Sequence, residues 1–192
     1  MAVIETKAKE ILIAAWGSTD TTYPTTGKAL DHVIADTLSV NQDDAEEQTF
    51  TFETTDTPET DYTAGAYKVD LNNACLSAEY MQEIMGWVKA KMATSGGKEV
   101  DVLAAPETYE TRYIALQVKM ADNKYYFLPK IAIAPKLVME SIKTNLVYGT
   151  LSGTCGNADT SDGKKTPIVK STVPILVKDT TNGTFDKEFA VE

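Results

Sequence analysis

The clearest pattern in the chain is an alternation of apolar and polar residues along Arg112–Met120. One set of positions is Ile114, Leu116, Val118 and Met120, and it alternates with Tyr113, Ala115, Gln117 and Lys119. A period of two is typical of a strand with one buried face and one exposed face. We therefore expect a strand here, with the second set facing solvent.

Two further strand segments are expected to follow. Ala121–Lys124 predicts a tight turn, because Asp and Asn tolerate the left-handed backbone that short hairpins need. The chain then returns through Tyr125–Ile133, where Pro129 restricts the ladder hydrogen bonds. A third run covers Lys136–Cys155 with a break near Asn145. Three strands in succession predict a sheet at the centre of the fold.

The first half of the chain adds shorter strands. Ile11–Trp16 is a brief apolar run that Gly17 ends, which favours a strand. The stretch Ala29–Val40 mixes helical and strand features, and we expect a strand that ends at Asn41. Ala66–Leu71 alternates in the same way as the central strand. These segments extend the predicted sheet.

One amphipathic helix is expected at residues 77–85. Ser77 occupies a typical N-cap position, and Glu79 lies in the first turn, where the helix dipole favours a carboxylate. Apolar side chains recur at helical spacing at Tyr80 or Met81, then Ile84 and Met85. The helix is thus predicted to pack on the sheet.

Gly86 is a natural end for this helix. Trp87–Met92 then becomes a strand with Val88, Ala90 and Met92 on its inner face. The alternative is a helix that continues to Met92, at a cost of about 1 kcal/mol for an interior glycine. We expect the helix to end at Gly86.

These elements predict a mainly β protein with one packed α-helix, α+β by the types of element present. The chain has 192 residues, enough for one sizeable core. We expect one domain over residues 1–156 and a C-terminal extension over residues 157–192. The extension is predicted to form a strand pair, Ile168–Val177 with Phe185–Val191, or an added arm.

Asn41–Gly65 has the most unusual composition in the chain. Its carboxylates are Asp43, Asp44, Glu46, Glu47, Glu53, Asp56, Glu59 and Asp61. Threonines, Phe50, Phe52 and Pro58 lie between them. So little apolar surface predicts a mobile loop or an irregular hairpin in an isolated subunit. A solvated acidic loop is the plain interpretation, and a cation site is the alternative, although the calcium-loop spacing is missing.

The charge balance limits the partners. The formal net charge is −10 and the isoelectric point is about 4.6. A nucleic-acid-binding protein needs a basic stripe, and the longest basic run is the pair Lys164 and Lys165. No run of about 18 apolar residues or signal-peptide pattern occurs, so we expect no membrane association and synthesis in the cytoplasm.

Catalytic chemistry has little support in the sequence. His32 is the only histidine, and a solitary histidine is more often a packing or surface residue than a general base. Cys75 and Cys155 have no histidine nearby in sequence and are too few for a disulfide framework. Gly96 and Gly97 lack the spacing of a phosphate-binding loop and predict a turn. We expect neither enzymatic activity, nor a metal, nor a cofactor.

The order of elements resembles the major tail tube proteins of long-tailed bacteriophages. The resemblance rests on the strand ending at Trp16 and Gly17, on "FETTDTPE" from Phe52, on "YKVDLNNACLSAEYMQEIMG" from Tyr67, and on "YYFLPKIAIAPKLVMESIKTNLVYGTLSGT" from Tyr125. It covers about residues 8–156. Gly156–Glu192 lies outside the pattern.

This resemblance implies a β-sandwich or barrel-like fold and the role of a structural virion protein. Its subunits would form hexameric rings that stack into a tail tube, with other tail proteins as partners and DNA passing through the lumen without tight binding. Within this family-based expectation, the candidate assembly loop is Asp43, Asp44, Glu46, Glu47, Phe50, Phe52, Glu53, Asp56 and Pro58, and the candidate sheet-edge strands carry Tyr113, Gln117, Lys119 and Tyr148. The alternative is a monomeric β-sandwich that binds a carbohydrate or a protein.

Overall fold

The computed structural model describes residues 8–17, 21–34, 36–52, 55–108, 110–140 and 146–185. Over these ranges the chain is mainly β with one short helix, which confirms the predicted fold class. The strands are β1 (Ala8–Ala15), β2 (Thr26–Ala29), β3 (Ser39–Gln42), β4 (Glu46–Phe52), β5 (Thr55–Thr63), β6 (Tyr67–Asn73), β7 (Val88–Ala93), β8 (Glu99–Ala104), β9 (Arg112–Met120), β10 (Tyr125–Glu140), β11 (Leu146–Gly156), β12 (Ala158–Asp159), β13 (Lys165–Thr166), β14 (Val169–Ser171) and β15 (Val177–Lys178), and the helix is α1 (Ala78–Glu83).

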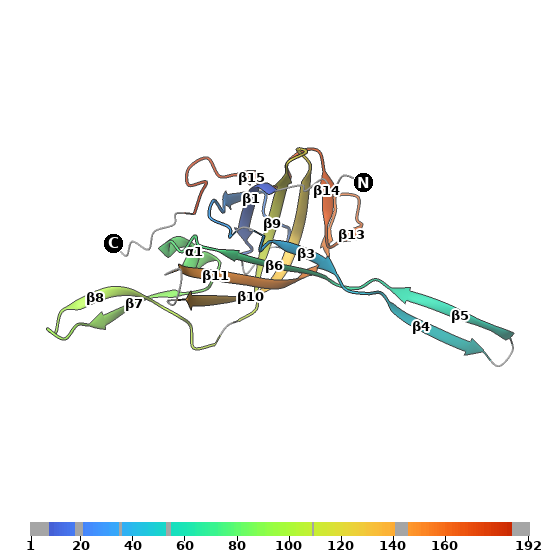
Figure 1. The fold of residues 1–192 in the computed structure, drawn as a ribbon, viewed down its shortest axis with the longest axis horizontal. Helices are drawn as coiled ribbons and strands as arrows, with labels where there is room; N and C mark the ends of the chain where they lie inside the picture. Colours follow the sequence, from blue (N-terminus) through green and yellow to red (C-terminus); the bar gives the residue numbers. More distant parts are fainter. Residues whose placement is uncertain are drawn as a thin grey trace.

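One nine-stranded sheet organises the body of the molecule (Figure 1). Its strand order is β15-β2-β1-β9-β10-β11-β6-β3, and β14 pairs with β10 beside this path. All pairings are antiparallel except that of β15 with β2. Because β15 and β3 end the path, the sheet is open and does not close into a barrel.

β10 is the long strand that joins the two halves of this sheet. Its register with β9 shifts between Leu128 and Ile131, around Pro129, which has no N–H to give to a ladder. The Trp16 indole Nε1 donates to the Pro129 carbonyl at 2.8 Å, which ties the shift to the end of β1. Residues 136–140, expected in the third strand, continue β10 instead, and β11 begins at Leu146. The predicted break at Asn145 lies outside the described residues.

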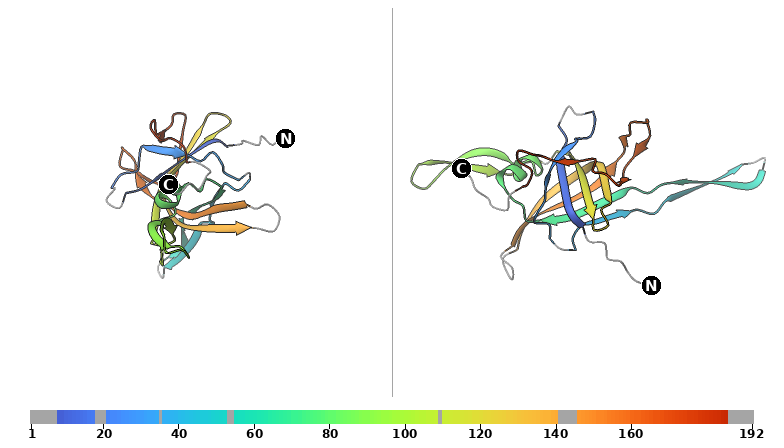
Figure 2. Two further views of the ribbon diagram at one scale, coloured as in Figure 1. Left: turned by 90° about the vertical axis from the view of Figure 1, so that its left-hand side faces the viewer. Right: turned by 90° about the horizontal axis from the view of Figure 1, so that it is seen from above.

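The main core lies against the inner face of this bent sheet. Buried side chains come from both halves, including Ile13 of β1, Leu116 of β9 and Leu151 of β11. Helix α1 adds Tyr80 and Met81, and the two residues that follow it add Ile84 and Met85; all four are at most 2% exposed, so the predicted apolar face is buried as expected. Figure 2 shows α1 beside the sheet body.

The start of α1 follows the sequence prediction, and the helix ends at Glu83, two residues before its predicted end. Ser77 is the N-cap, and its side chain accepts a hydrogen bond from the Tyr80 N–H at 3.2 Å. Gly86 has φ +80°, a conformation that suits glycine, and lets the chain turn away from the helix. The Arg112 guanidinium donates to the Glu83 carbonyl at 2.8 Å, placing a cation at the negative end of the helix.

The outer face of β9 is exposed at Tyr113, as expected, but it is buried in its middle. Ala115 and Gln117 are 0% and 2% exposed. A second apolar cluster covers this face, and it joins Ala115 with Leu12, Phe127 and Leu176. The prediction of a wet face was wrong for Ala115 and Gln117, because a segment 59 residues further along the chain returns to cover them.

That segment belongs to the predicted C-terminal extension. β14 pairs with β10 and β15 with β2, whereas the prediction paired Ile168–Val177 with Phe185–Val191. The side chain of Phe185 is 1% exposed and packs edge-on against Tyr80, with ring centroids 5.2 Å apart. Residues 186–192 lie outside the described part. Through Phe185 the C-terminal segment contributes to the same core as the rest of the chain.

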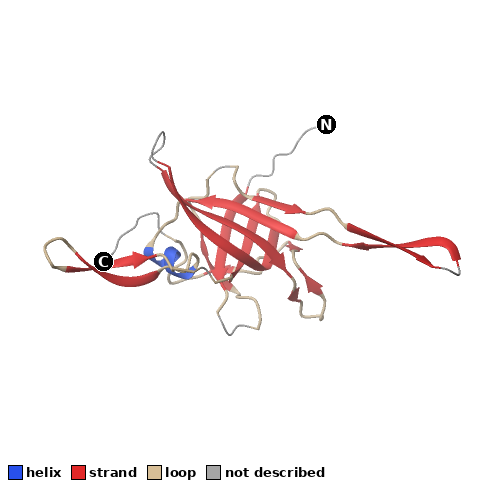
Figure 3. Ribbon diagram, turned by 90° about the horizontal axis from the view of Figure 1, so that it is seen from below, coloured by secondary structure: helices blue, strands red, loops and turns tan. Residues whose placement is uncertain are grey.

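Two hairpins project from opposite ends of the body. The pair β4–β5 extends at one end and β7–β8 at the other, as Figures 1 and 3 show. Each is a separate two-stranded sheet. These projections give the molecule its elongated outline.

Candidate functional site

The acidic segment forms the β4–β5 hairpin, the second of its two predicted forms. β3 pairs with β6 at its base, and the Asp43 N–H donates to the Ala66 carbonyl at 2.9 Å. Lys68 Nζ lies 2.9 Å from Asp43 Oδ2. The predicted strand ending at Asn41 is therefore the short β3, and its role is to begin this hairpin.

Gly65 explains how the two chain segments at the base of the β4–β5 hairpin approach each other. A Cβ on Gly65 would overlap the Asp43 carbonyl oxygen, so the backbones meet more closely than any other residue allows. Further out, the register shifts between Phe50 and Phe52, opposite the part of β5 that contains Pro58. Pro58 has no N–H for the ladder, which is consistent with this irregularity.

The structure brings the candidate assembly residues together on this projection. Asp43 and Asp44 precede β4 and are exposed, as are Glu46 and Glu47 within it. Phe50 and Phe52 are also on β4, and Asp56 and Pro58 are on β5. Glu53 lies outside the described residues. Over the described part of the chain, no group of three or more His, Cys, Asp or Glu residues is arranged to hold a metal ion.

The β7–β8 hairpin is the feature that sequence reasoning placed wrongly. Val88 and Met92 are 52% and 62% exposed rather than inward-facing. The strand itself was predicted, but its partner is β8 and not the main sheet. The signal for this was the alternation in "VKAKMA" and "EVDVLA" on either side of the glycine turn, which is typical of a self-contained hairpin.

The turn of this hairpin is built from local hydrogen bonds. The Thr94 N–H donates to the Lys98 carbonyl at 2.8 Å, and the Gly97 N–H donates to the Thr94 carbonyl at 2.9 Å. Gly97 has φ +75°, which a side chain would strain. The expected turn at Gly96 and Gly97 is confirmed.

Three of the four predicted sheet-edge residues lie inside the sheet and not on its edge. Tyr113, Gln117 and Lys119 belong to β9, which is flanked by β1 and β10. Tyr148 is on β11, opposite Val138 of β10. Alternation alone could not distinguish a central strand from an edge strand, and the ends of the path are β3 and β15.

Gln117 instead has a buried structural role. Its Nε2 donates to the Leu176 carbonyl at 2.8 Å, and its Oε1 accepts from the N–H groups of Ile175 and Leu176 at 2.7 and 2.8 Å. These bonds pair with the backbone of a bend that directly precedes β15. The C-terminal segment is thereby held on the outer face of β9.

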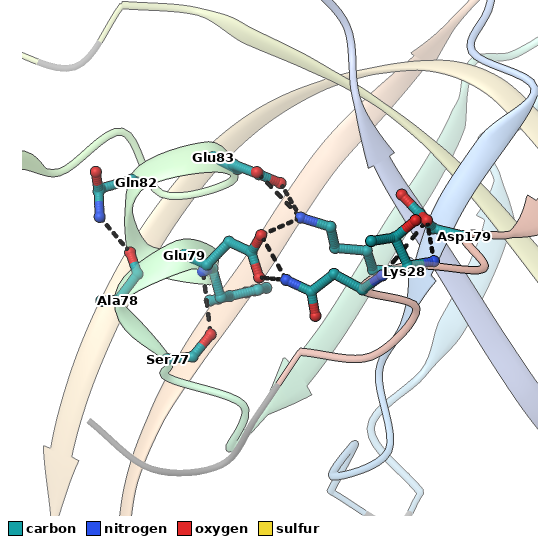
Figure 4. Close-up of polar contacts among 10 residues, drawn as sticks. Lys28, Ser77, Ala78, Glu79, Gln82, Glu83 and Asp179 are labelled. Atoms are coloured by element: carbon teal, nitrogen blue, oxygen red, sulfur yellow. Dashed lines mark hydrogen bonds and ion pairs between the residues drawn. The ribbon is translucent and has the colours of Figure 1, made fainter. Parts of the chain in front are cut away.

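A second polar cluster fixes the same segment to α1 (Figure 4). Lys28 Nζ lies 2.5 Å from Glu79 and 3.1 Å from Glu83, and the Asn182 amide donates to Glu79 at 2.9 Å. Burial lowers the Lys28 pKa, but the hydrogen bonds from Lys28 to both carboxylates outweigh it and leave the pKa raised. The backbone N–H groups of Thr181 and Asn182 lower the Asp179 pKa. Glu79, which lies in the first turn of α1, thus also binds Lys28 of β2 and Asn182 of the C-terminal segment.

Cys75 and Cys155 are both buried and are not joined in a disulfide, and Cys75 lies near the only histidine of the sequence. His32 Nδ1 is 3.9 Å from Cys75 Sγ, a proximity the sequence spacing did not indicate. Cys75 is 0% exposed, so its sulfur is not accessible to a substrate in this conformation. Burial raises the pKa of the Cys155 thiol to about 11, which disfavours the nucleophilic thiolate.

A shallow groove crosses β6, β10 and β11. It has a volume of about 410 Å³ and is lined by residues that include Lys68, Asp70, Ala132 and Ser152. None of its lining residues is aromatic, whereas sugar-binding surfaces rely on aromatic rings. Tyr125 and Tyr126 are half-buried, and each has a lysine over its ring at 5.6 Å.

No protein-family model and no known protein compared by sequence matches this chain. No described helix has the length and hydrophobicity needed to span a membrane.

Proposed function

We propose that this chain is a structural virion protein, a subunit that assembles into stacked hexameric rings and forms the tail tube of a long-tailed phage. The observation that supports this best is the pair of hairpins projecting from opposite ends of one sheet body (Figure 1). An isolated two-stranded hairpin is at best marginally stable in water. Hairpins of this kind gain stability when another subunit covers them.

Placement at opposite ends favours repeated head-to-tail contacts. Such heterologous contacts use two different surfaces of one subunit, and they produce rings or open stacks rather than a closed dimer. The ends of the sheet path, β3 and β15, provide edges for lateral pairing within a ring. The partners are then further copies of the chain and other tail proteins, in the host cytoplasm during assembly and in the virion tail afterwards.

The charge also fits passage of DNA through such a tube. At −10 per chain, six copies carry a formal charge of about −60. A wall with this charge repels phosphates and leaves DNA free to move. The proposal includes no enzymatic activity, cofactor or membrane partner.

The direct test is the size and shape of the purified protein as its concentration rises. Sedimentation velocity and negative-stain electron microscopy should show rings or tubes. A protein that stays monomeric at every concentration would overturn the proposal and favour the monomeric binding module.

A hairpin deletion tests the same proposal at one end of the subunit. Replacing residues 45–64 with a short turn should leave the core folded, because the core residues lie elsewhere, and should prevent rings from stacking. Normal tubes from this variant would show that β4–β5 has no part in assembly.

A further inference from the structure

The β7–β8 hairpin has one face made only of apolar side chains. The register places Val88 opposite Ala104, Ala90 opposite Val102 and Met92 opposite Val100. Residues directly opposite each other in a ladder project from the same face. Six apolar residues therefore share this face, and Val88, Met92 and Val100 are 52%, 62% and 38% exposed. We call these six residues the apolar hairpin face.

Such a face is unusual at the surface of a subunit that is otherwise strongly acidic. Contiguous exposed apolar patches mark interaction sites in soluble proteins. The remaining side chains of this hairpin and its turn include Lys89, Lys91 and Lys98 against Glu99 and Asp101, a net charge of +1 in a chain of −10. The projection therefore combines apolar area with positive charge.

The other hairpin has the opposite charge. The sequence of Glu46–Thr63 contains six carboxylates and no basic residue. Its sequence also contains three aromatic residues, Phe50, Phe52 and Tyr62. Its position at the far end of the body means that it meets β7–β8 only on a different copy of the chain (Figure 1).

We infer that the apolar hairpin face and its neighbouring lysines form the docking site for the acidic β4–β5 hairpin of a second copy. This inference rests on the proposed self-assembly and identifies the two surfaces that meet. Burial of the apolar face supplies the contact area, and the opposite charges select the head-to-tail orientation over contacts between like hairpins. A duplex DNA partner is disfavoured, because three lysines beside two carboxylates do not form a basic stripe.

The first test weakens each side of the contact separately. Lys89→Glu with Lys91→Glu changes the β7–β8 charge from +1 to about −3, and replacement of Glu46, Glu47, Glu59 and Asp61 by Lys changes β4–β5 from −6 to about +2. Each variant should raise the concentration at which half the protein assembles by about tenfold or more. Lys164→Glu with Lys165→Glu makes the same charge change as the first variant in an exposed turn elsewhere, and should assemble like the wild type.

The second test combines both sets in one chain. Because the charges are then exchanged and again complementary, assembly should recover most of the loss seen in either variant. A combined variant no better than the separate ones would overturn the charge pairing. Circular dichroism and thermal unfolding verify that each protein is folded.

A third variant examines the apolar face directly. Met92→Asp with Val100→Asp should prevent assembly and leave the thermal midpoint close to that of the wild type, since both side chains are exposed in the subunit. If the wild type forms tubes and this variant does too, the docking site is wrong and the proposed function stands. A wild type that never assembles overturns both.

Discussion

Gln117 demonstrates how one polar side chain organises an apolar face. It is 2% exposed and makes three hydrogen bonds to the backbone of Ile175 and Leu176. An amide has both a donor and an acceptor, so it can pair with both the N–H and the C=O groups of this bend. At the same position, an apolar side chain would leave buried N–H and C=O groups without partners.

Gln117→Leu should therefore lower the free energy of unfolding by about 3 kcal/mol, since buried unsatisfied groups cost about 1–3 kcal/mol each. Urea denaturation of the monomer measures this. The matched control is Gln42→Leu, where the amide is exposed and donates one bond, to the Gly65 carbonyl at 3.3 Å. This control should change the stability by no more than about 0.5 kcal/mol. Equal effects would contradict the role of Gln117.

Lys28 gives a prediction about pH. Its raised pKa results from hydrogen bonds to Glu79 and Glu83 that outweigh the opposing effect of burial. A lysine whose pKa is higher in the folded state than in the unfolded state stabilises the fold at any pH below its unfolded pKa of 10.5. This stabilisation is lost as the pH rises through the pKa of the folded state. At pH 7 to 9, Lys28→Met should be less stable than the wild type by about 1 kcal/mol.

Above a pH of about 10.5 this difference should shrink. The measurement is the unfolding free energy of both proteins across the pH series. Lys164→Met removes the same charge from an exposed turn and provides the control. A difference that stays constant through pH 12 would show that the Lys28 contacts contribute through packing and not through charge.

At the scale of elements, the two hairpins differ in how closely other backbone approaches their glycines. The base of β4–β5 depends on the close approach at Gly65, where a Cβ would overlap the Asp43 carbonyl. Within the turn of β7–β8, a Cβ on Gly96 would meet no atom within 4 Å. Replacement of glycine by alanine is therefore expected to disturb β4–β5 at Gly65 and to leave β7–β8 unchanged at Gly96.

Gly65→Ala should open the base of β4–β5 and speed protease cleavage within residues 43–66, while the thermal midpoint of the core changes little. Gly96→Ala should leave the cleavage rate of β7–β8 unchanged. Limited proteolysis with mass spectrometry gives both rates. Unaltered cleavage in Gly65→Ala would mean that the two arms can separate there without loss of the hairpin.

At the scale of the whole molecule, the C-terminal segment is part of the core. Leu176 and Phe185 are 0% and 1% exposed, and the cluster around Leu176 covers the outer face of β9. Fully burying side chains of this size stabilises by about 1.5–3 kcal/mol each. Their loss would remove a large share of the stability of a domain of this size.

A chain ending at Gly156 should therefore show no cooperative thermal unfolding, or a midpoint lower by about 10 °C or more. A chain ending at Phe185 keeps both side chains and should unfold within a few degrees of the full chain. Differential scanning calorimetry compares the two. Cooperative unfolding of the shorter chain at the normal temperature would instead support a separate domain over residues 1–156.

The sequence by itself determined the local elements of this protein. Alternation located β9 and β6, while Ser77 and Gly86 marked the ends of the α1 region, because side-chain period and backbone preference depend only on neighbours in the chain. The excess of carboxylates in Asn41–Gly65 identified the segment that became the acidic hairpin.

Only the tertiary structure decided what each face meets. The outer face of β9 is buried because residues 175–176 return to it, and β9 is central because β1 and β10 flank it. Val88 and Met92 face solvent because β7 pairs with β8 away from the core. A period of two shows that side chains alternate, but it contains no information on which side a distant segment will cover.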